Sequence, residues 1–208
     1  MVRKIVRRST HRVVGYHASI KVSGLVPWES QIEQAYFEWL EVDPEIISFK
    51  AQPRTFLWSD TRYTPDALVA TDSGSFYVEV KPDKVLEDHV QMARLTDITR
   101  RLAELGLSLK LVLRSEVFRA PLRDNVVRLM RLTRKPLAAR LRDAILTELA
   151  LGPKRLSDFS NFKGVDIETA LLQCVVGRLI CLDLQKPINA QAVFSLPSEG
   201  ASNVTFQD

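Results

Sequence analysis

The stretch YTPDALVATDSGSFYVEVKP at residues 63–82 places the strongest constraint on the fold. Two runs rich in β-branched and aromatic residues flank the turn-forming sequence TDSGS, and this pattern predicts a β-hairpin. Because side chains alternate across a strand, Val78 and Val80 point to one face while Glu79 and Lys81 point to the other. The valines are expected to pack in a core. The charged pair needs a different explanation.

The segments around this hairpin predict a mixed α/β domain. The sequence from Pro27 to Asp43 places its apolar side chains on one helical stripe and ends before a proline. IISFKAQPRTFLW predicts strands with Pro53 at an edge or a break, and a long helix is expected from about Lys84 to Leu105 with Gly106 as its cap. LSLKLVLR predicts one more strand. This order gives a sheet of mixed direction that is flanked by helices, the arrangement of an α/β fold.

The remainder of the chain predicts a second, smaller domain. Residues 137–197 contain three helical segments followed by two short strands around Lys186-Pro187, which is the order of a winged helix. A chain of 208 residues is long enough for one core and a small second one. We therefore expect a basic arm at 1–26, an α/β domain at 27–125, a winged-helix-like domain at 137–197 and a tail at 198–208.

The charge distribution fits a polyanionic partner. The net charge of +4 is small, but Arg and Lys are concentrated at residues 2–12 and 128–142, which contain no acid. Solvated surfaces explain these patches equally well. No apolar run is long enough to span a bilayer, so we expect an intracellular protein with no membrane partner. Cys174 and Cys181 lack metal-ligand spacing and are expected to be buried, reduced thiols.

The polar residues of the hairpin predict a metal site. If the hairpin closes near Ser73-Gly74, Asp66 lies close to Glu79, and two neighbouring carboxylates repel each other unless a cation lies between them. Mg²⁺ prefers oxygen ligands, so we expect Asp66, Glu79 and the carbonyl of Val80 to bind it, with Mn²⁺ as a substitute. Lys81 can then orient or help to deprotonate an attacking water and stabilise the transition state.

A third acid is expected from the helix that precedes the sheet. WESQIEQAYFEW offers Glu29 and Glu33 one turn apart on one helix face. We favour Glu33, which we place in the middle of the helix, where its side chain can face the sheet. The P-D and E-x-K elements alone also fit a surface ion pair. The order of acidic helix, hairpin, long helix and strand favours catalysis instead.

Pro65-Asp66, followed across the hairpin by Glu79-Val80-Lys81, resembles the motif of the PD-(D/E)xK nucleases. The succession WESQIEQAYFEWLEVDPEIISFKAQP, YTPDALV and YVEVKP resembles the TnsA family of transposon endonucleases over roughly residues 20–115. The resemblance implies a restriction-endonuclease-like core that acts as one subunit of a cut-and-paste transposase and cuts the non-transferred strand at transposon ends. Glu33, Asp66, Glu79 and Lys81 would be the matching catalytic positions.

The resemblance also implies partners and a location. These are double-stranded DNA at transposon ends, a DDE-type transposase subunit, and an ATPase regulator with which the family's winged-helix-like C-terminal portion is associated. The location implied is the prokaryotic cytoplasm, at the nucleoid. Two alternatives stay open: a non-catalytic module that tethers DNA or a partner, and a stand-alone repair or restriction nuclease. Gln52 either lines the active groove or satisfies the backbone at a strand break, and only one of His89 and Gln91 can face the cleft.

Overall fold

A computed structural model describes residues 13–133 and 135–197, and their contacts divide into two compact units. Within this part of the chain, the first unit contains residues 13–40 and 46–118, and the second contains 41–45 and 119–197. Helix α4 (Leu122–Met130), which the expected boundary at residue 125 would divide, belongs entirely to the second unit. Most of the predicted arm, Arg134 and the tail lie outside the described residues.

The first unit is built on a mixed four-stranded sheet with the order β3-β6-β7-β8. The first three of these strands pair antiparallel, and β8 joins β7 in parallel. A parallel neighbour needs a crossover, which the segment containing α2 provides. The elements of the unit in chain order are β1 (Gly15–Ala18), β2 (Leu25–Trp28), α1 (Gln31–Val42), β3 (Ile46–Ala51), β4 (Phe56–Leu57), β5 (Arg62–Tyr63), β6 (Ala67–Thr71), β7 (Gly74–Lys81), η1 (Asp83–Glu87), α2 (His89–Glu104), β8 (Leu109–Leu113) and α3 (Arg114–Val117).

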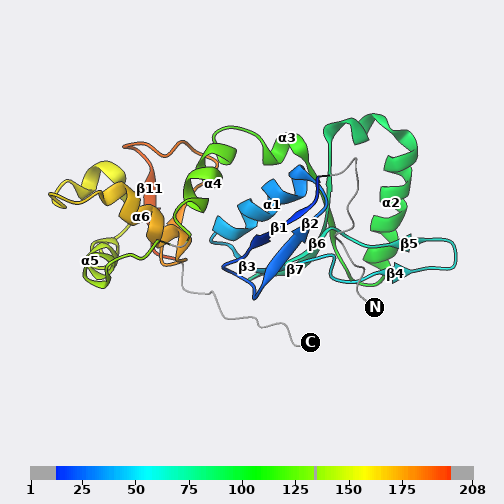
Figure 1. Cartoon of the computed structure of the whole chain (residues 1–208), viewed down its shortest axis with the longest axis horizontal. Helices are drawn as coiled ribbons and strands as arrows, with labels where there is room; N and C mark the ends of the chain where they lie inside the picture. The colour runs from blue at the N-terminus through cyan, green and yellow to red at the C-terminus, as the bar shows by residue number, and fades with distance from the viewer. Residues whose placement is uncertain (1–12, 134, 198–208) are drawn as a thin grey trace. The chain divides into compact units, whose positions relative to one another are not determined.

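Helices α1 and α2 cover opposite faces of this sheet (Figure 1). On the α1 face, Val78 and Val80 join a buried cluster with aromatic side chains such as Phe37 and Phe49. On the α2 face, Tyr77 packs with a second buried cluster that includes Ile98, Leu102, Phe56 and Tyr63. The predicted fold class of a mixed sheet flanked by helices is therefore confirmed, and it is consistent with a restriction-endonuclease-like fold.

The central hairpin has the register that the sequence pattern predicts. Thr71 pairs with Gly74 across a two-residue turn, and Ala67 pairs with Val78. The next position along places Asp66 opposite Glu79, and the Asp66 N–H donates to the Val78 carbonyl at 2.9 Å. Because the two strands run antiparallel from a short turn, the acid at the start of one faces the acid near the end of the other.

The first helix begins later than the predicted Pro27. Residues 25–28 form strand β2, which pairs with β1 and places Pro27 opposite Tyr16. The helix then begins after Ser30, whose side-chain oxygen accepts the Glu33 N–H at 3.1 Å. A serine followed three residues later by a glutamate is an N-terminal capping pattern, and here it overrides the proline as the start signal.

The predicted long helix after the hairpin is divided in two. A short 3-10 helix, η1, precedes α2, and Asp88 separates them. The Asp88 carboxylate accepts the Gln91 N–H at 3.0 Å and so caps α2. Gly106 follows α2 with φ 72°, a left-handed conformation that a glycine adopts without strain, as the predicted helix cap requires.

The second unit combines helices with a small antiparallel sheet of order β10-β11-β9. Helices α4 and α5 both contact α6. Asn125 is buried, and its side-chain amide donates to the carbonyls of Leu184 at 2.9 Å and Lys186 at 2.8 Å. The elements after α4 are α5 (Ala139–Leu149), β9 (Lys154–Arg155), η2 (Leu156–Phe159), α6 (Ile167–Val176), β10 (Cys181–Leu182) and β11 (Val193–Ser195).

Both cysteines lie in the second unit, and both are free thiols. Cys174 is buried, as predicted, whereas Cys181 is only half-buried. Burial raises the pKa of the Cys174 thiol to about 11, so it stays protonated and unreactive at neutral pH. Among the helices of the described residues, none has the length and apolarity needed to cross a membrane.

Candidate active site

The site forms where β6 begins and β7 ends. One Asp66 carboxylate oxygen, Oδ2, accepts the Val80 N–H at 2.7 Å. Lys81 Nζ lies 2.5 Å from Glu79 Oε1, and the Tyr63 hydroxyl donates to Glu79 Oε2 at 2.8 Å. Each polar group of the predicted motif is therefore held by a specific contact, and Glu79 is fixed by partners at both of its oxygens.

Glu33 belongs to the same electrostatic cluster, but it does not lie mid-helix as predicted. It is in the first turn of α1. Its carboxylate accepts hydrogen bonds from the Glu29 N–H and the Ser30 hydroxyl, each at 2.9 Å. The start of the helix at Gln31, rather than at Pro27, explains the difference. Glu33 therefore caps the helix as well as facing the charged site.

Burial and like charge act together on the acids. Burial raises the pKa of Asp66 well above its usual range, and the charges of Glu79 and Glu33 raise it further. Burial also raises the pKa of Glu33, against the opposing effect of its two hydrogen bonds. Their poorly solvated position near other carboxylates therefore disfavours the ionised forms of Asp66 and Glu33.

Lys81 provides the local positive charge. Burial is the largest single influence on its pKa and acts to lower it, but the surrounding carboxylates of Glu79, Asp66 and Glu33 together outweigh burial and raise it. Lys81 is therefore an ammonium ion at neutral pH. Such a group stabilises developing negative charge, for example on a phosphoryl group in the transition state.

The donor set fits a hard divalent cation of the Mg²⁺ type. Among the described residues no group of three or more histidine, cysteine or acidic side chains is arranged to hold a metal. Mg²⁺ does not need one, since it is often bound by one or two carboxylates and several waters. Asp66 and Glu79 supply two carboxylates, and the Val80 N–H points toward Asp66. The carbonyl of a residue in an extended strand points to the same edge as its N–H, which places the Val80 oxygen toward Asp66.

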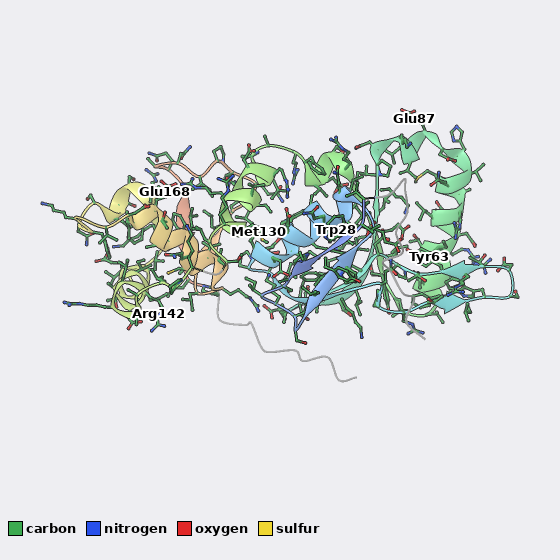
Figure 2. All side chains as sticks on the ribbon, viewed as in Figure 1. Trp28, Tyr63, Glu87, Met130, Arg142 and Glu168 are labelled. Carbon is green, nitrogen blue, oxygen red and sulfur yellow. The ribbon has the colours of Figure 1, made fainter. Side chains whose placement is uncertain are left out.

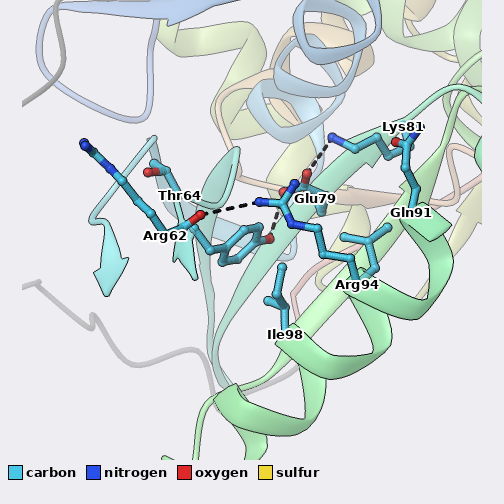
Figure 3. A pocket seen from close by; sticks show the side chains of 9 residues that line it. Arg62, Thr64, Glu79, Lys81, Gln91, Arg94 and Ile98 are labelled. Atoms are coloured by element: carbon cyan, nitrogen blue, oxygen red, sulfur yellow. Dashed lines mark hydrogen bonds and ion pairs between the residues drawn. The ribbon is translucent and has the colours of Figure 1, made fainter. Parts of the chain in front are cut away.

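A cavity of about 370 Å³ opens beside Glu79 and Lys81, on the α2 face of the sheet (Figure 3). Tyr63, at the end of β5, packs against Ile98 of α2 and forms part of the cavity wall (Figure 2). Sequence reasoning missed this residue, since no spacing rule connects a tyrosine in one hairpin to a glutamate in another. The other lining residues are Arg62, Thr64, Gln91, Arg94, Leu95 and Ile98.

Two questions left open by the sequence receive an answer. Of His89 and Gln91, only Gln91 lines this cavity. The Gln52 N–H donates to the Asp66 carbonyl at 2.9 Å, so Gln52 continues the pairing of β3 with β6 past the ends of both strands. Its φ of 44° is unusual for a residue other than glycine. This strained turn lies directly beside Asp66, and strain of this kind is concentrated at functional sites.

Comparison with known proteins gives a distant nuclease relative. No protein-family model matches the chain. The chain is 29% identical over 83 residues to the head completion nuclease of Enterobacteria phage T4, an alignment that covers 36% of this chain and 55% of the phage protein. The chain thus spans about half the length of the relative that it matches. This likeness supports a nuclease function in general.

Proposed function

We propose that this protein is a Mg²⁺-dependent DNA endonuclease, with Mn²⁺ as a substitute. The observation that carries the proposal is that Asp66 is hydrogen-bonded to Val78 and Val80, on either side of Glu79, while Lys81 is paired to Glu79. Burial and the neighbouring acids raise the pKa of Asp66. Carboxylates that repel each other in a buried place bind a divalent cation favourably. The distant relation to a phage nuclease supports the same reaction class.

In this proposal Asp66, Glu79 and the Val80 carbonyl hold the metal, which supplies Lewis-acid stabilisation of the scissile phosphate when bound. The chain's own residues have separate tasks. The Lys81 ammonium lies beside Glu79, where it can orient the attacking water and stabilise negative charge on the phosphoryl oxygens. Tyr63 fixes the orientation of Glu79 through its hydroxyl. Glu33 keeps the start of α1 in place and adds negative charge to the site.

We further propose that the endonuclease is a transposase subunit of the TnsA type, which cuts the non-transferred strand at transposon ends together with a DDE-type partner. The resemblance of residues 20–115 to that family supports this role. The second candidate is a stand-alone repair or restriction nuclease, and the similarity to a phage nuclease is equally compatible with it. A non-catalytic tethering module is the third, and the intact Asp66, Glu79 and Lys81 argue against it.

One experiment separates these roles. The purified chain is incubated with Mg²⁺ and DNA that carries a transposon end, with and without the neighbouring transposase, and the cut strands are mapped. A transposase subunit should cut the non-transferred strand at the end only when the partner is present. A stand-alone nuclease should cut equally well without the partner, and a tethering module should cut in neither case.

We also propose that the second unit is a winged helix that binds the ATPase regulator. The order α5, β9, η2, α6, β10 and β11 supports the assignment. The α6 sequence IETALLQCVV contains no Lys or Arg, and Glu168 on it forms an ion pair with Arg128. A helix without cations is poorly suited to phosphate contacts. We expect the second unit to bind the regulator with an affinity that changes little as the salt concentration rises, and to bind DNA weakly and only at low salt.

A further inference from the structure

The cavity beside Glu79 and Lys81 contains a cation that the proposed reaction does not use. Arg94 reaches from α2 toward Glu79, and its guanidinium is within 3.4 Å of the Arg62 carbonyl (Figure 3). Among the described residues it forms no ion pair with a carboxylate. Its side chain lines the cavity together with that of Tyr63.

Other arginines on the same helix behave differently. Arg100 pairs with Asp97 and Glu104, and Arg101 pairs with Asp60 and Asp97. These pairs lie on the part of α2 beyond the cavity, and they neutralise the local charge. An arginine that lines a cavity without an acidic partner is instead available for an anionic ligand, and guanidinium groups bind phosphate oxygens well.

The remaining walls of the cavity define what kind of anion fits. Leu95 and Ile98 lie one turn of α2 apart at the floor of the cavity and are almost fully buried, so the apolar area that they present is small. The ring of Tyr63 lies against the same cluster. The Arg62 side chain points away from Arg94, and the Gln91 amide is bonded to Asp88, so neither fills the space (Figure 3). The cavity therefore combines a cation and polar walls with a small apolar floor, which suits a compact ligand with a phosphate and a flat ring.

Size limits the ligand further. At about 370 Å³ the cavity is at the small end of the range for ligand sites, roughly 300–1,000 Å³. A base pair within a duplex is too large for such a space, whereas one unstacked nucleotide fits, as it does in enzymes that take a base out of the helix. Because Glu79 and Lys81 form part of the wall, this nucleotide lies next to the bond that is cut.

We propose that the cavity binds one unpaired nucleotide of the cut strand, with Arg94 on its phosphate and its base against Leu95 and Ile98. This inference rests on the proposed nuclease function and narrows the substrate to DNA that is unpaired, or easily unpaired, beside the cut. Arg94 is thus assigned as a substrate-binding residue rather than a structural one.

The test is a calorimetric titration of the full chain, in Mg²⁺ buffer, with thymidine 5′-monophosphate, which has no internucleotide bond to cut. Wild type should bind the nucleotide at least tenfold more tightly than inorganic phosphate. Arg94→Ala should weaken nucleotide binding at least tenfold. Arg100→Ala, which removes an exposed arginine from the same helix, should leave it unchanged. Circular dichroism controls for folding.

A matched DNA assay follows, with duplexes that are fully paired or carry one unpaired nucleotide at the cut. Wild type should prefer the unpaired form, and Arg94→Ala should lose the preference. Equal binding of nucleotide and phosphate, or an Arg94→Ala variant that binds like wild type, would overturn the nucleotide pocket even if cleavage occurs. Nucleotide binding without any DNA cleavage would support the pocket and overturn the nuclease instead.

Discussion

The two units each contain a partly buried Lys–Glu pair, and the pairs differ in their surroundings. Lys81 and Glu79 in the first unit have side-chain exposures of 27% and 9%, and Lys154 and Glu148 in the second have 24% and 30%. The hydrogen bond and charge of Lys154 lower the pKa of Glu148, and Asn161 adds a further contact. In that pair the positive charge of Lys154 balances the negative charge of Glu148.

In the first unit the single positive charge of Lys81 faces more than one carboxylate. Asp66 and Glu33 add their charges to Glu79, and the pKa values of both are raised rather than lowered. A fold that buries mutually repelling carboxylates gives up stability, which proteins tolerate where a ligand later relieves the repulsion. The comparison teaches that the number of neighbouring acids, rather than the presence of an ion pair, distinguishes the candidate active site from a structural contact.

The largest expected effect on cleavage comes from removing Lys81, and removal of Lys154 is its control. Lys81→Ala should reduce DNA cleavage by about 10³-fold or more, because it removes the ammonium beside the scissile phosphate. Lys154→Ala removes a lysine of similar exposure from the second unit and should leave the cleavage rate within about twofold of wild type. Rates are measured under single-turnover conditions. Comparable losses of cleavage rate in both variants would show that the two Lys–Glu pairs do not differ in function.

The next effect concerns stability in the second unit. Asn125→Ala leaves the buried carbonyl of Leu184 and the partly buried carbonyl of Lys186 without their donor and should cost about 2 kcal/mol of unfolding free energy. Cleavage by the folded protein should stay near the wild-type rate, since Asn125 takes no part in the candidate active site. Denaturant unfolding followed by circular dichroism gives the free energy. A variant as stable as wild type would show that these hydrogen bonds do not contribute to the free energy of unfolding.

A smaller effect is expected at the tyrosine that holds Glu79. Tyr63→Phe removes one hydrogen bond to the Glu79 carboxylate and should lower cleavage about tenfold, equivalent to about 1.4 kcal/mol. Tyr77→Phe removes a hydroxyl from the same buried cluster and serves as the control. If the two variants cleave equally well, Tyr63 does not position Glu79.

The smallest effect is a gain of stability in the metal-free protein. The pKa of Asp66 is raised in the folded state, so the folded chain keeps a proton that the unfolded chain releases above pH 3.8. Stability from this group is present at low pH and is lost as the pH rises through the folded-state pKa. Asp66→Asn keeps an acceptor for the Val80 N–H and removes the charge.

In EDTA at pH 7, Asp66→Asn should therefore be more stable than wild type by about 1 kcal/mol, or several degrees in melting temperature. The difference should shrink toward pH 4. Asp72→Asn, at the exposed turn of the same hairpin, controls for loss of a surface charge. A lower melting temperature at pH 7 would show that Asp66 does not experience net repulsion.

The local sequence was sufficient to predict the β6–β7 hairpin and the proximity of Asp66 and Glu79. The short turn after Thr71 fixes the register, and a fixed register places Asp66 opposite Glu79 without information from the rest of the chain. The face on which Val78 and Val80 pack follows from alternation alone. The catalytic roles of these acids and of Lys81 stay predictions until cleavage is measured.

The contributions of distant segments could not be predicted in the same way. The start of α1 depended on whether Pro27 would join a strand, and that strand exists because β1 pairs with it. Because the prediction started the helix too early, it placed Glu33 in the middle of the helix, whereas the structure places it in the first turn. Tyr63 bonds to Glu79, and Arg94 lines the cavity beside it, through tertiary packing of a separate hairpin and of α2, which no periodic signal in the sequence predicts.

The most direct test of the account is the Mg²⁺ dependence of DNA cleavage by the purified protein and its Asp66→Ala variant. Wild type should nick plasmid DNA in a Mg²⁺-dependent manner and lose all activity in EDTA. Asp66→Ala should be inactive at every Mg²⁺ concentration, whereas Asp72→Ala should cut like wild type. Cleavage by wild type in EDTA, or by folded Asp66→Ala in Mg²⁺ at the wild-type rate, would contradict the assignment of this site.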